Sequence, residues 1–285
     1  MKLCVTSDIV SKREDGSAIP FQETLRFLKN AGFEEIDFDL TVPMLLASDW
    51  REAFRLALAQ AGDAGVRFRY AHLPFDYPRP DGAYDWDAFF LASRRAIELA
   101  VEAGVDCAAI HPHTFMTRDY DAAREHDEAL RFLAPYRDAA REAGLALALE
   151  NMRGPGRSAP KEIMRYGTET DDLLRLADEL DVGVCWDTGH ANISAQDQRE
   201  SIARIGARLL MVHVNDNFAE DDVHIAPFIG NVDWRGVANG LKAANYRGSL
   251  NLEVGCNRLP EALRAGYAAY MAASARTLAE MIGNP

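Results

Sequence analysis

Long apolar runs are missing from this sequence, and so are paired cysteines. No stretch of about 18 apolar residues occurs, which disfavours a transmembrane helix. The first residues, MKLCVTSD, lack the long apolar segment of a signal peptide. The four cysteines, Cys4, Cys107, Cys185 and Cys256, lie singly in apolar stretches, as buried free thiols of a reducing compartment do. We therefore expect a cytoplasmic protein that has no membrane partner.

Positive charge is also scarce. The 285 residues include 31 Lys and Arg against 44 Asp and Glu, a net charge of −13, and no basic run occurs. Proteins that bind nucleic acid normally present a basic surface, because phosphates dominate the affinity. The composition therefore disfavours a nucleic-acid partner and leaves a small-molecule substrate as the expectation.

What the sequence has instead is a recurring unit, in which an Ala-rich helical stretch ends near Gly and a short apolar run follows. Junctions such as DAGVRFRYAH, EAGVDCAAIH and EAGLALALE show it. Gly tolerates the left-handed conformation that ends many helices, and an apolar run is typical of a strand buried on both faces of a parallel sheet. The predicted strands are 2–7, 34–39, 67–72, 106–111, 145–150, 182–187, 208–214 and 248–254.

Helical patterns separate these strands, at 20–31, 49–64, 85–103, 121–143, 169–180, 195–206, 233–244 and 259–282. Pro135 lies inside the fourth pattern and should kink or split that helix. Eight β–α units without a linker predict an α/β fold, a single (β/α)8 TIM barrel over residues 1–285. A doubly wound open sheet is the alternative, but no G-x-G-x-x-G turn follows the first strand.

Polar residues stand at the ends of these strands. The apolar run LALAL stops at Glu150, and other strands end in YAH, AIHPH, CWDTGH, MVHVNDN and LNLEV. One such residue is more often a cap or a hydrogen-bonded structural group. A closed barrel, however, brings all carboxyl ends of its strands to one rim, where its active sites lie. Six of the seven histidines fall at this predicted rim, and His126 alone lies in a helical pattern.

Converging carboxylates repel one another unless a cation lies between them. We expect one divalent metal ion held by Glu150, Asp187, His213 and Glu253, from four consecutive strands. Oxygen ligands with one imidazole suit Mn²⁺, Mg²⁺ or Co²⁺, and additional imidazoles favour Zn²⁺. His190 follows Asp187 by three residues and should face the same pocket, as a group that binds substrate or a second metal.

The motifs ALEN, DTGH, HVNDN and HIAPFIGNVDW, with AHLPF and AIHPH before them, resemble the sugar phosphate isomerase/epimerase family of xylose isomerase-like barrels. The resemblance covers nearly the whole chain. It implies the same four metal ligands, with Glu150 and Glu253 also acting as acid and base on the two faces of a keto sugar through an enediolate. The expected substrate pocket is lined by His72, His111, His190, Asp222 and His224.

The resemblance leaves three alternatives open. Dehydratases of the same superfamily use the same enediolate to expel a leaving group. Endonuclease IV-type enzymes hold three zinc ions, and all nine of their ligand types are matched here, although the charge and the absence of an Arg-rich loop disfavour DNA. A non-catalytic sugar-binding barrel is disfavoured because none of the four metal positions is lost. Members of this fold are often dimers or tetramers, so a homo-oligomer is compatible with the resemblance.

Two departures from the family pattern bear on the substrate. HPH replaces the frequent HPG, which brings in His113, and APFIG replaces PGEG, which brings in Phe228 and Ile229. The loop after the seventh predicted strand is acidic, so we expect an unphosphorylated sugar.

Five other side chains near strand ends carry expectations. Phe75 and Tyr77 are expected near the substrate, and Trp186 should point outward to the helices. Arg153 and Arg157 are read as solvated loop residues, with anion contact as the alternative.

Overall fold

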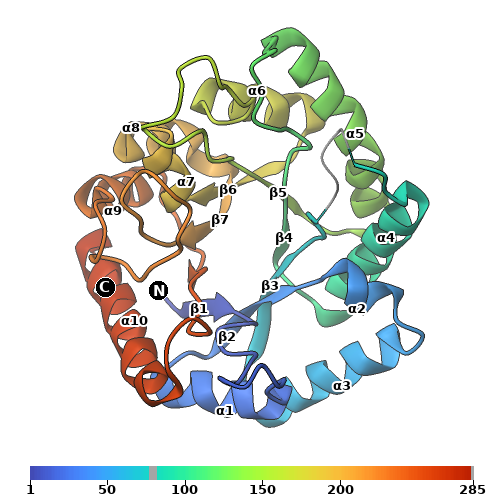
Figure 1. The fold of residues 1–285 in the computed structure, drawn as a ribbon, viewed down its shortest axis with the longest axis vertical. Coiled ribbons are helices and arrows are strands. Elements are labelled where there is room, and N and C mark those ends of the chain that lie inside the picture. The colour runs from blue at the N-terminus through green and yellow to red at the C-terminus, as the bar shows by residue number, and fades with distance from the viewer. Residues whose placement is uncertain (77–81, 284–285) are drawn as a thin grey trace.

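The computed structural model describes residues 1–76 and 82–283, and its eight described strands close into one parallel barrel in chain order (Figure 1). Each strand pairs with the next, and β1 pairs with β8. The predicted (β/α)8 barrel is therefore confirmed, and the open doubly wound sheet is excluded. The strands are β1 Leu3–Thr6, β2 Glu35–Asp39, β3 Arg67–His72, β4 Cys107–Ile110, β5 Leu147–Glu150, β6 Gly183–Asp187, β7 Leu209–Val214 and β8 Leu250–Leu252.

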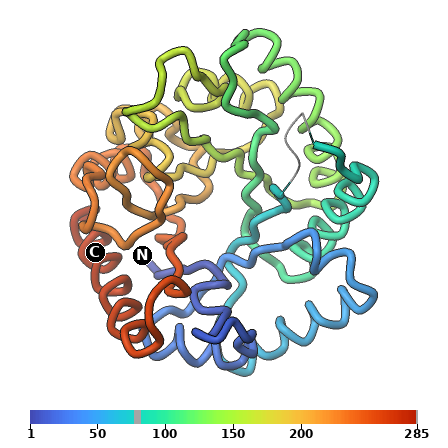
Figure 2. Tube along the Cα trace, in the orientation of Figure 1, coloured from blue at the N-terminus to red at the C-terminus, as the bar shows by residue number. Residues whose placement is uncertain are grey.

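Helices form the outer ring. The described α-helices are α1 Phe21–Ala31, α2 Val42–Leu46, α3 Trp50–Asp63, α4 Trp86–Ala103, α5 Ala122–Ala143, α6 Thr170–Leu180, α7 Thr188–Ile193, α8 Gln198–Ile205, α9 Trp234–Ala243 and α10 Glu261–Ile282. The chain winds once around the barrel axis, so its first and last segments lie side by side, blue beside red (Figure 2). Within the described residues, no helix has both the length and the apolarity that crossing a bilayer requires.

The sequence signals mark most of these elements correctly. Gly104 and Gly144 end α4 and α5 in the left-handed conformation that the junctions predicted. Pro135 was predicted to kink or split its helix, and the split does not occur, because α5 runs unbroken through it. Leu133 and Tyr136 on either side are buried, and we attribute the continuity to this packing, which compensates for the hydrogen bond that proline removes.

Two apolar layers lie on the two sides of the barrel wall. The outer layer, between strands and helices, includes Trp186, whose indole nitrogen donates to Gln198 of α8 at 2.8 Å, as its predicted outward direction requires. The inner layer fills the barrel and consists of Cys4, Tyr70, Cys107, Ala109, Ala148, Cys185 and Met211. All four cysteines are buried free thiols, as predicted. Further along the same strands, this alternation turns the polar residues toward the barrel axis.

Candidate active site

The carboxyl ends of β5 to β8 bring the four predicted metal ligands together. Glu150 and Asp187 are the last residues of β5 and β6, His213 pairs with Asp187 across β6 and β7, and Glu253 follows β8. One donor atom from each of the four lies within 4.8 Å of the others. The convergence that the strand-end pattern predicted is therefore present in the fold.

Glu150 lies at the centre of this cluster and is only 1% exposed. Its Oε2 lies 3.2 Å from His111 Nε2, 3.3 Å from His213 Nδ1 and 3.4 Å from His72 Nε2, and its Oε1 lies 3.3 Å from His190 Nδ1. Burial alone would raise its carboxyl pKa. The nearby histidines, His213 and His111 above all, outweigh burial and hold the pKa well below its usual value. The strand ends in a charge because four imidazoles surround it.

Glu253 lies on the open side of the cluster, with a side chain that is 24% exposed. Its Oε2 is 3.3 Å from His213 Nδ1, so both glutamates approach the same ring nitrogen. Burial opposes its ionisation, but His213 and His224 lower the pKa of Glu253 to about 2. One glutamate is therefore enclosed and the other faces a cavity.

Asp187 is held by contacts that the sequence analysis did not identify. Its backbone N–H donates to Asn151 Oδ1 at 2.6 Å, and its Oδ2 accepts from Asn215 Nδ2 at 2.7 Å. Its Oδ1 caps α7 by accepting from the backbone N–H of His190 at 2.6 Å. Burial is the main cause that raises the pKa of Asp187 to about 6, although His190 opposes the rise. Asn151 of ALEN thus holds the backbone of Asp187, and Asn215 of HVNDN orients its carboxylate.

The packing around Asp187 also explains why residue 189, in the motif DTGH, is a glycine. A Cβ atom at this position would lie 1.9 Å from Asn215 Oδ1 and 2.8 Å from Asn217 Nδ2. Such distances are far inside van der Waals contact, so any larger residue would displace the asparagine that holds Asp187. Glycine is required here because the segment after β7 lies so close to α7, and not because of the backbone angles of residue 189.

His190, Asp222 and His224 form a second chain beside Asp187. Asp222 Oδ2 lies 3.2 Å from His190 Nε2, and its Oδ1 lies 3.1 Å from His224 Nε2. The Asp222 carboxyl has a pKa well below its usual range, because the hydrogen bonds and charges of both histidines outweigh its burial. Burial lowers the pKa of His224, but the neighbouring Glu253 and Asp222 outweigh it and raise that pKa to about 10. These three predicted pocket residues therefore lie together.

The donor set fits a divalent cation. Glu150 Oε2, His213 Nδ1 and Glu253 Oε2 are buried and have no hydrogen-bond partner among the described residues. Buried polar atoms without partners are costly, and three that converge on one position are a donor set that a cation would satisfy. Three carboxylates and one imidazole suit Mn²⁺, Mg²⁺, Co²⁺ or Zn²⁺.

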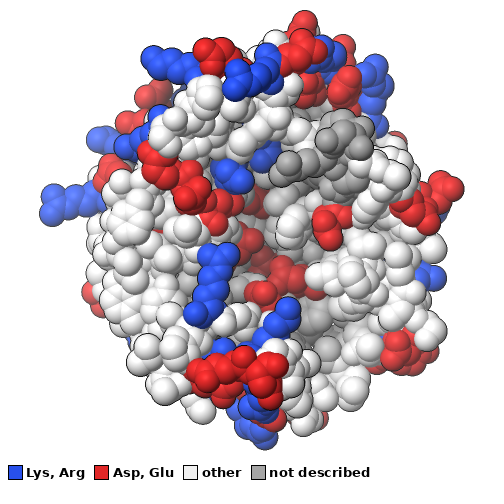
Figure 3. Space-filling model, in the orientation of Figure 1, with Lys and Arg blue, Asp and Glu red and all other residues white. Residues whose placement is uncertain are grey.

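A cavity of about 430 Å³ opens from Glu253, Asp222 and His224 toward the ends of β1 and β2. Its far wall includes residues that the sequence analysis missed: Thr6, Asp8, Asp39 and Thr41. Acidic side chains gather in the hollow at the centre of this face (Figure 3). Asp39 ends β2 as Glu150 ends β5, so the strand-end criterion applied to this strand would have found it.

Two aromatic residues at the rim have different surroundings. Phe75 packs against His72 and His111 with ring centroids 4.8 Å apart in each pair, and its side chain is exposed beside the cavity. Its predicted partner Tyr77 lies outside the described residues. His113, which replaces the glycine of the family's HPG motif, stacks on Phe132 with ring centroids 4.2 Å apart and contacts Trp86. It therefore belongs to the packing around α4 and α5.

The loop after β7 is organised by Asp216. Its carboxylate accepts from the backbone N–H of Gly230 at 2.9 Å and Val232 at 3.1 Å, and from Trp234 Nε1 at 3.0 Å. The motif IGNVDW therefore has a structural role, since its residues hold this loop in place through Asp216.

In the loop after β5, Arg153 Nε approaches Asp222 Oδ2 at 3.5 Å. Arg157 is exposed, as read from the sequence.

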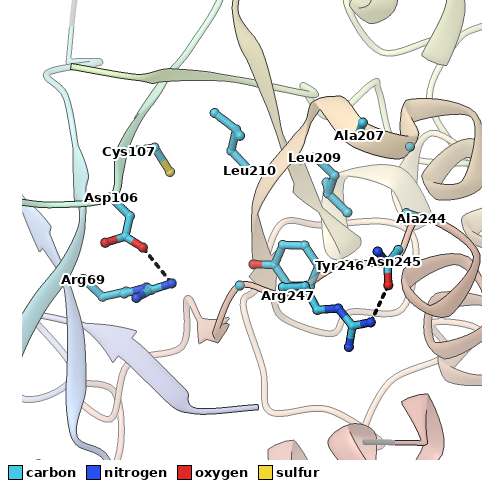
Figure 4. A pocket seen from close by; sticks show the side chains of 12 residues that line it. Arg69, Asp106, Cys107, Ala207, Leu209, Leu210, Ala244, Asn245, Tyr246 and Arg247 are labelled. Carbon is cyan, nitrogen blue, oxygen red and sulfur yellow. Dashed lines mark hydrogen bonds and ion pairs between the residues drawn. The ribbon is translucent and has the colours of Figure 1, made fainter. Parts of the chain in front are cut away.

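A second hollow of about 480 Å³ lies at the opposite end of the barrel, where the strands begin. Figure 4 shows it with its arginines already paired: Arg69 with Asp106 at 2.7 Å, and Arg247 with Asn245 at 2.6 Å. The predicted metal ligands all lie at the other end. Active sites of TIM barrels occupy the carboxyl face, so this hollow is not the candidate site.

This chain matches known proteins over different shares of its length. Over 156 residues, 49% of the chain and 50% of the relative, it is 26% identical to inosose dehydratase of Lactiplantibacillus plantarum. The chain spans about a quarter to about half of the curated relatives that it matches.

Solved structures match across the whole barrel. A D-tagatose 3-epimerase-like protein superposes with a TM-score of 0.73, at 20% identity over 99% of this chain and 98% of that one. The 3-keto-D-glucoside 4-epimerase of E. coli superposes with a TM-score of 0.70, at 18% identity over 98% and 99% of the two chains. At such identities the likeness establishes the fold. The family model described as the xylose isomerase-like TIM barrel matches residues 25–277, so this chain belongs to that family.

Proposed function

We propose that this protein is a divalent-metal-dependent isomerase or epimerase of a small keto sugar, acting by proton transfer through an enediolate. The observation that carries the proposal is the pair Glu150 and Glu253, whose Oε2 atoms both lie 3.3 Å from His213 Nδ1. Two carboxylates that converge on one ligand position can divide between them the removal and the return of a carbon-bound proton.

The metal would be held by Glu150, Asp187, His213 and Glu253. A cation bound there supplies a Lewis acid that polarises the carbonyl of the sugar and favours the enediolate. Asn151 fixes the backbone of Asp187 and Asn215 fixes its carboxylate, and the shared position of the four donor atoms supports a single principal site.

The two glutamates divide the proton transfer. Glu253 faces the cavity and takes a proton from the carbon next to the carbonyl, or returns one to it, on that side. Glu150 does the same on the enclosed side, where the surrounding imidazoles keep it ionised. If one glutamate removes the proton and the other returns one on the opposite face, the configuration at the carbon inverts.

The chain of His190, Asp222 and His224 would bind the sugar oxygens next to the reacting carbon. His190 and His224 each have Nε2 within 3.2 Å of Asp222, so both rings are fixed before substrate enters. The cavity wall contributes Asp8 and Asp39 against one arginine, Arg258. Carboxylates repel phosphate and accept hydrogen bonds from hydroxyl groups, which supports an unphosphorylated substrate.

The solved structures with this fold include proteins named as sugar epimerases, which supports the proposed reaction class. The partial match to an inosose dehydratase supports the alternative, in which the enediolate loses a leaving group from the next carbon. Both reactions begin with the same proton removal, so they share the four ligands and both glutamates.

A second candidate, an endonuclease IV-type zinc phosphodiesterase, is favoured by one observation. His72, His190 and His224 each place Nδ1 within 2.9 Å of a backbone carbonyl, which leaves Nε2 directed into the site. His72 Nε2, like Glu150 Oε2, has no hydrogen-bond partner among the described residues. Three overlapping groups of ligand atoms result, and these suit more than one metal ion. The acidic cavity and the net charge of −13 oppose a DNA substrate.

Elemental analysis of the purified protein tests the proposal first. About one Mn, Mg, Co or Zn per chain is expected, together with a lower melting temperature after treatment with EDTA, because binding to the folded state alone stabilises it. Deuterium uptake from D₂O into a panel of ketoses then reports proton transfer. Full activity of metal-free protein would overturn the mechanism, and two or three zinc ions per chain would direct the assay to phosphodiesters.

A further inference from the structure

A buried carboxylate beneath the candidate metal site has no part in the proton transfer. Asp37 lies in the middle of β2 and is 3% exposed. Its Oδ2 lies 3.3 Å from His213 Nε2 and accepts a hydrogen bond from Asn251 Nδ2 at 2.7 Å. Removing a carboxylate from water is costly unless it is paired, so its position requires an explanation.

The explanation lies in the two nitrogens of His213. Nδ1 faces Glu150 and Glu253, and Nε2 faces Asp37 on the opposite side of the ring. A neutral imidazole carries one proton, and a metal ligand must offer a bare nitrogen. If Nδ1 is to be the ligand, the proton must reside on Nε2, which the Asp37 carboxylate faces at 3.3 Å.

We propose that Asp37 is a positioning residue that holds His213 in the tautomer and orientation for metal binding through Nδ1. The inference rests on the proposed metal centre. Asn251 fixes Asp37 in turn, and the sheet register places Asn251 directly beside His213. The chain Asn251–Asp37–His213 is buried along its whole length, so solvent does not compete with its contacts. Partners of this kind typically change metal affinity by roughly 10- to 100-fold.

The same strand offers a matched control. Glu35 lies two residues before Asp37, is fully buried and turns toward the same interior. Its contacts are different: Lys2 Nζ at 3.3 Å, Arg69 Nε at 3.9 Å and the hydroxyl of Ser249. None of the described contacts of Glu35 involves a residue of the metal cluster. Replacing Glu35 therefore removes a buried acid of β2 without touching His213.

The test compares Asp37→Asn with Glu35→Gln by measuring the Kd for Mn²⁺ and Zn²⁺ and the absorption spectrum of bound Co²⁺. We expect Asp37→Asn to weaken binding roughly 10- to 100-fold and to alter the Co²⁺ spectrum, which reports ligand geometry. Glu35→Gln should keep the wild-type Kd even if its melting temperature falls. The melting temperature of each metal-free variant separates loss of fold from loss of affinity.

Two results would overturn the inference: an unchanged Kd in Asp37→Asn, or an equal loss in Glu35→Gln. If Asp37→Asn does not fold, Asn251→Ala removes the donor that orients Asp37 and should weaken binding by a smaller factor. An unchanged Kd in that variant would then overturn it. Wild-type protein that binds no metal would overturn the proposed function as well, so the two failures are distinguishable.

Discussion

The two ends of the barrel carry hollows of similar size, about 430 Å³ at the carboxyl end and about 480 Å³ at the other. Their polar groups differ in how they are paired. At the amino end, Arg69 pairs with Asp106, Arg247 with Asn245, and the Tyr246 hydroxyl donates to the Ser249 carbonyl. At the carboxyl end, buried oxygen and nitrogen atoms of Glu150, His213 and Glu253 converge with no hydrogen-bond partner among the described residues.

Volume alone therefore does not identify a site in this fold. At the amino end Arg69 Nε also lacks a hydrogen-bond partner within the described part of the chain, but it lies 3.9 Å from Glu35 Oε2, so a neighbouring charge of the protein itself offsets it. A hollow whose buried carboxylates and imidazoles point at one position remains incomplete without a cation or a substrate. The comparison predicts that substitutions at the carboxyl end act on chemistry and metal affinity, whereas those at the amino end act on stability alone.

The largest effect is expected from the two glutamates. Glu150→Gln and Glu253→Gln each remove a proton-transfer group, so turnover should fall by roughly 10²- to 10⁴-fold, because general acid–base catalysis contributes about that much. Steady-state kinetics and circular dichroism would measure the loss and confirm the fold. Arg247→Ala at the amino end is the control and should keep the wild-type rate. A near-normal rate in either glutamine variant would remove that residue from the proton transfer.

An intermediate effect is expected at Gly189. A methyl group there would collide with Asn215 and displace the donor that orients Asp187, so metal affinity should weaken by roughly 10- to 100-fold. Titration calorimetry measures the affinity. Gly266→Ala is the control, because a Cβ atom at that exposed position of α10 meets nothing within 4 Å. That change should leave affinity unaltered and add up to about 1 kcal/mol of stability. Wild-type affinity in Gly189→Ala would contradict the packing argument.

The same comparison explains which parts of the site the sequence revealed. The strand-end residues were predictable because each belongs to a local signal, an apolar run that stops at a carboxylate or an imidazole. Glu150, Asp187, His213 and Glu253 all fall under that rule. Asp187 also caps the short helix α7, which begins at Thr188, an element that the sequence analysis did not predict. Their roles as ligands and catalysts stay predictions.

The supporting residues could not be read in the same way. Asn215 reaches Asp187 only because β6 and β7 lie side by side. Asp37 reaches His213 only because β2 faces β7 across the interior. Both contacts join residues distant in the sequence. In EEIDFD the acids Glu35, Asp37 and Asp39 alternate with apolar residues, a pattern that predicts a strand but does not indicate what the acids face. The fold was predictable because its signals are local and repeat eight times.

A smaller effect is expected at the amino end. The Tyr246 hydroxyl is buried, donates to Ser249 O at 2.9 Å and lies 3.4 Å from the Tyr70 hydroxyl. Tyr246→Phe leaves a buried carbonyl with one partner fewer, which should cost about 1 kcal/mol. For a domain of this size the melting temperature should fall by about 2–4 °C, as calorimetry can measure. Metal affinity should not change, and a loss of affinity would show that the two ends are coupled.

The last expected effect is one of pH dependence and concerns Asp39, in the cavity wall at the carboxyl end. Burial, reinforced by the charges of Asp37 and Asp8, raises the pKa of its carboxyl to about 7, although Thr6 donates to it at 2.8 Å. Between about pH 4 and pH 7 the folded state therefore binds a proton that the unfolded state has released. Stability falls as pH rises through this window, because ionising Asp39 costs the folded state.

Asp39→Asn stays neutral at every pH, so this contribution to the pH dependence should vanish. The variant's melting temperature relative to wild type should rise between pH 5 and pH 8, measured by calorimetry on metal-free protein. Asp8→Asn is the control, because removing one neighbouring charge should shift the window to lower pH without abolishing it. A melting-temperature difference that stays constant from pH 5 to pH 8 would show that Asp39 ionises as freely in the folded chain as in the unfolded one. The far wall of the cavity would then resemble the hollow at the amino end, where most polar groups pair with other groups of the protein.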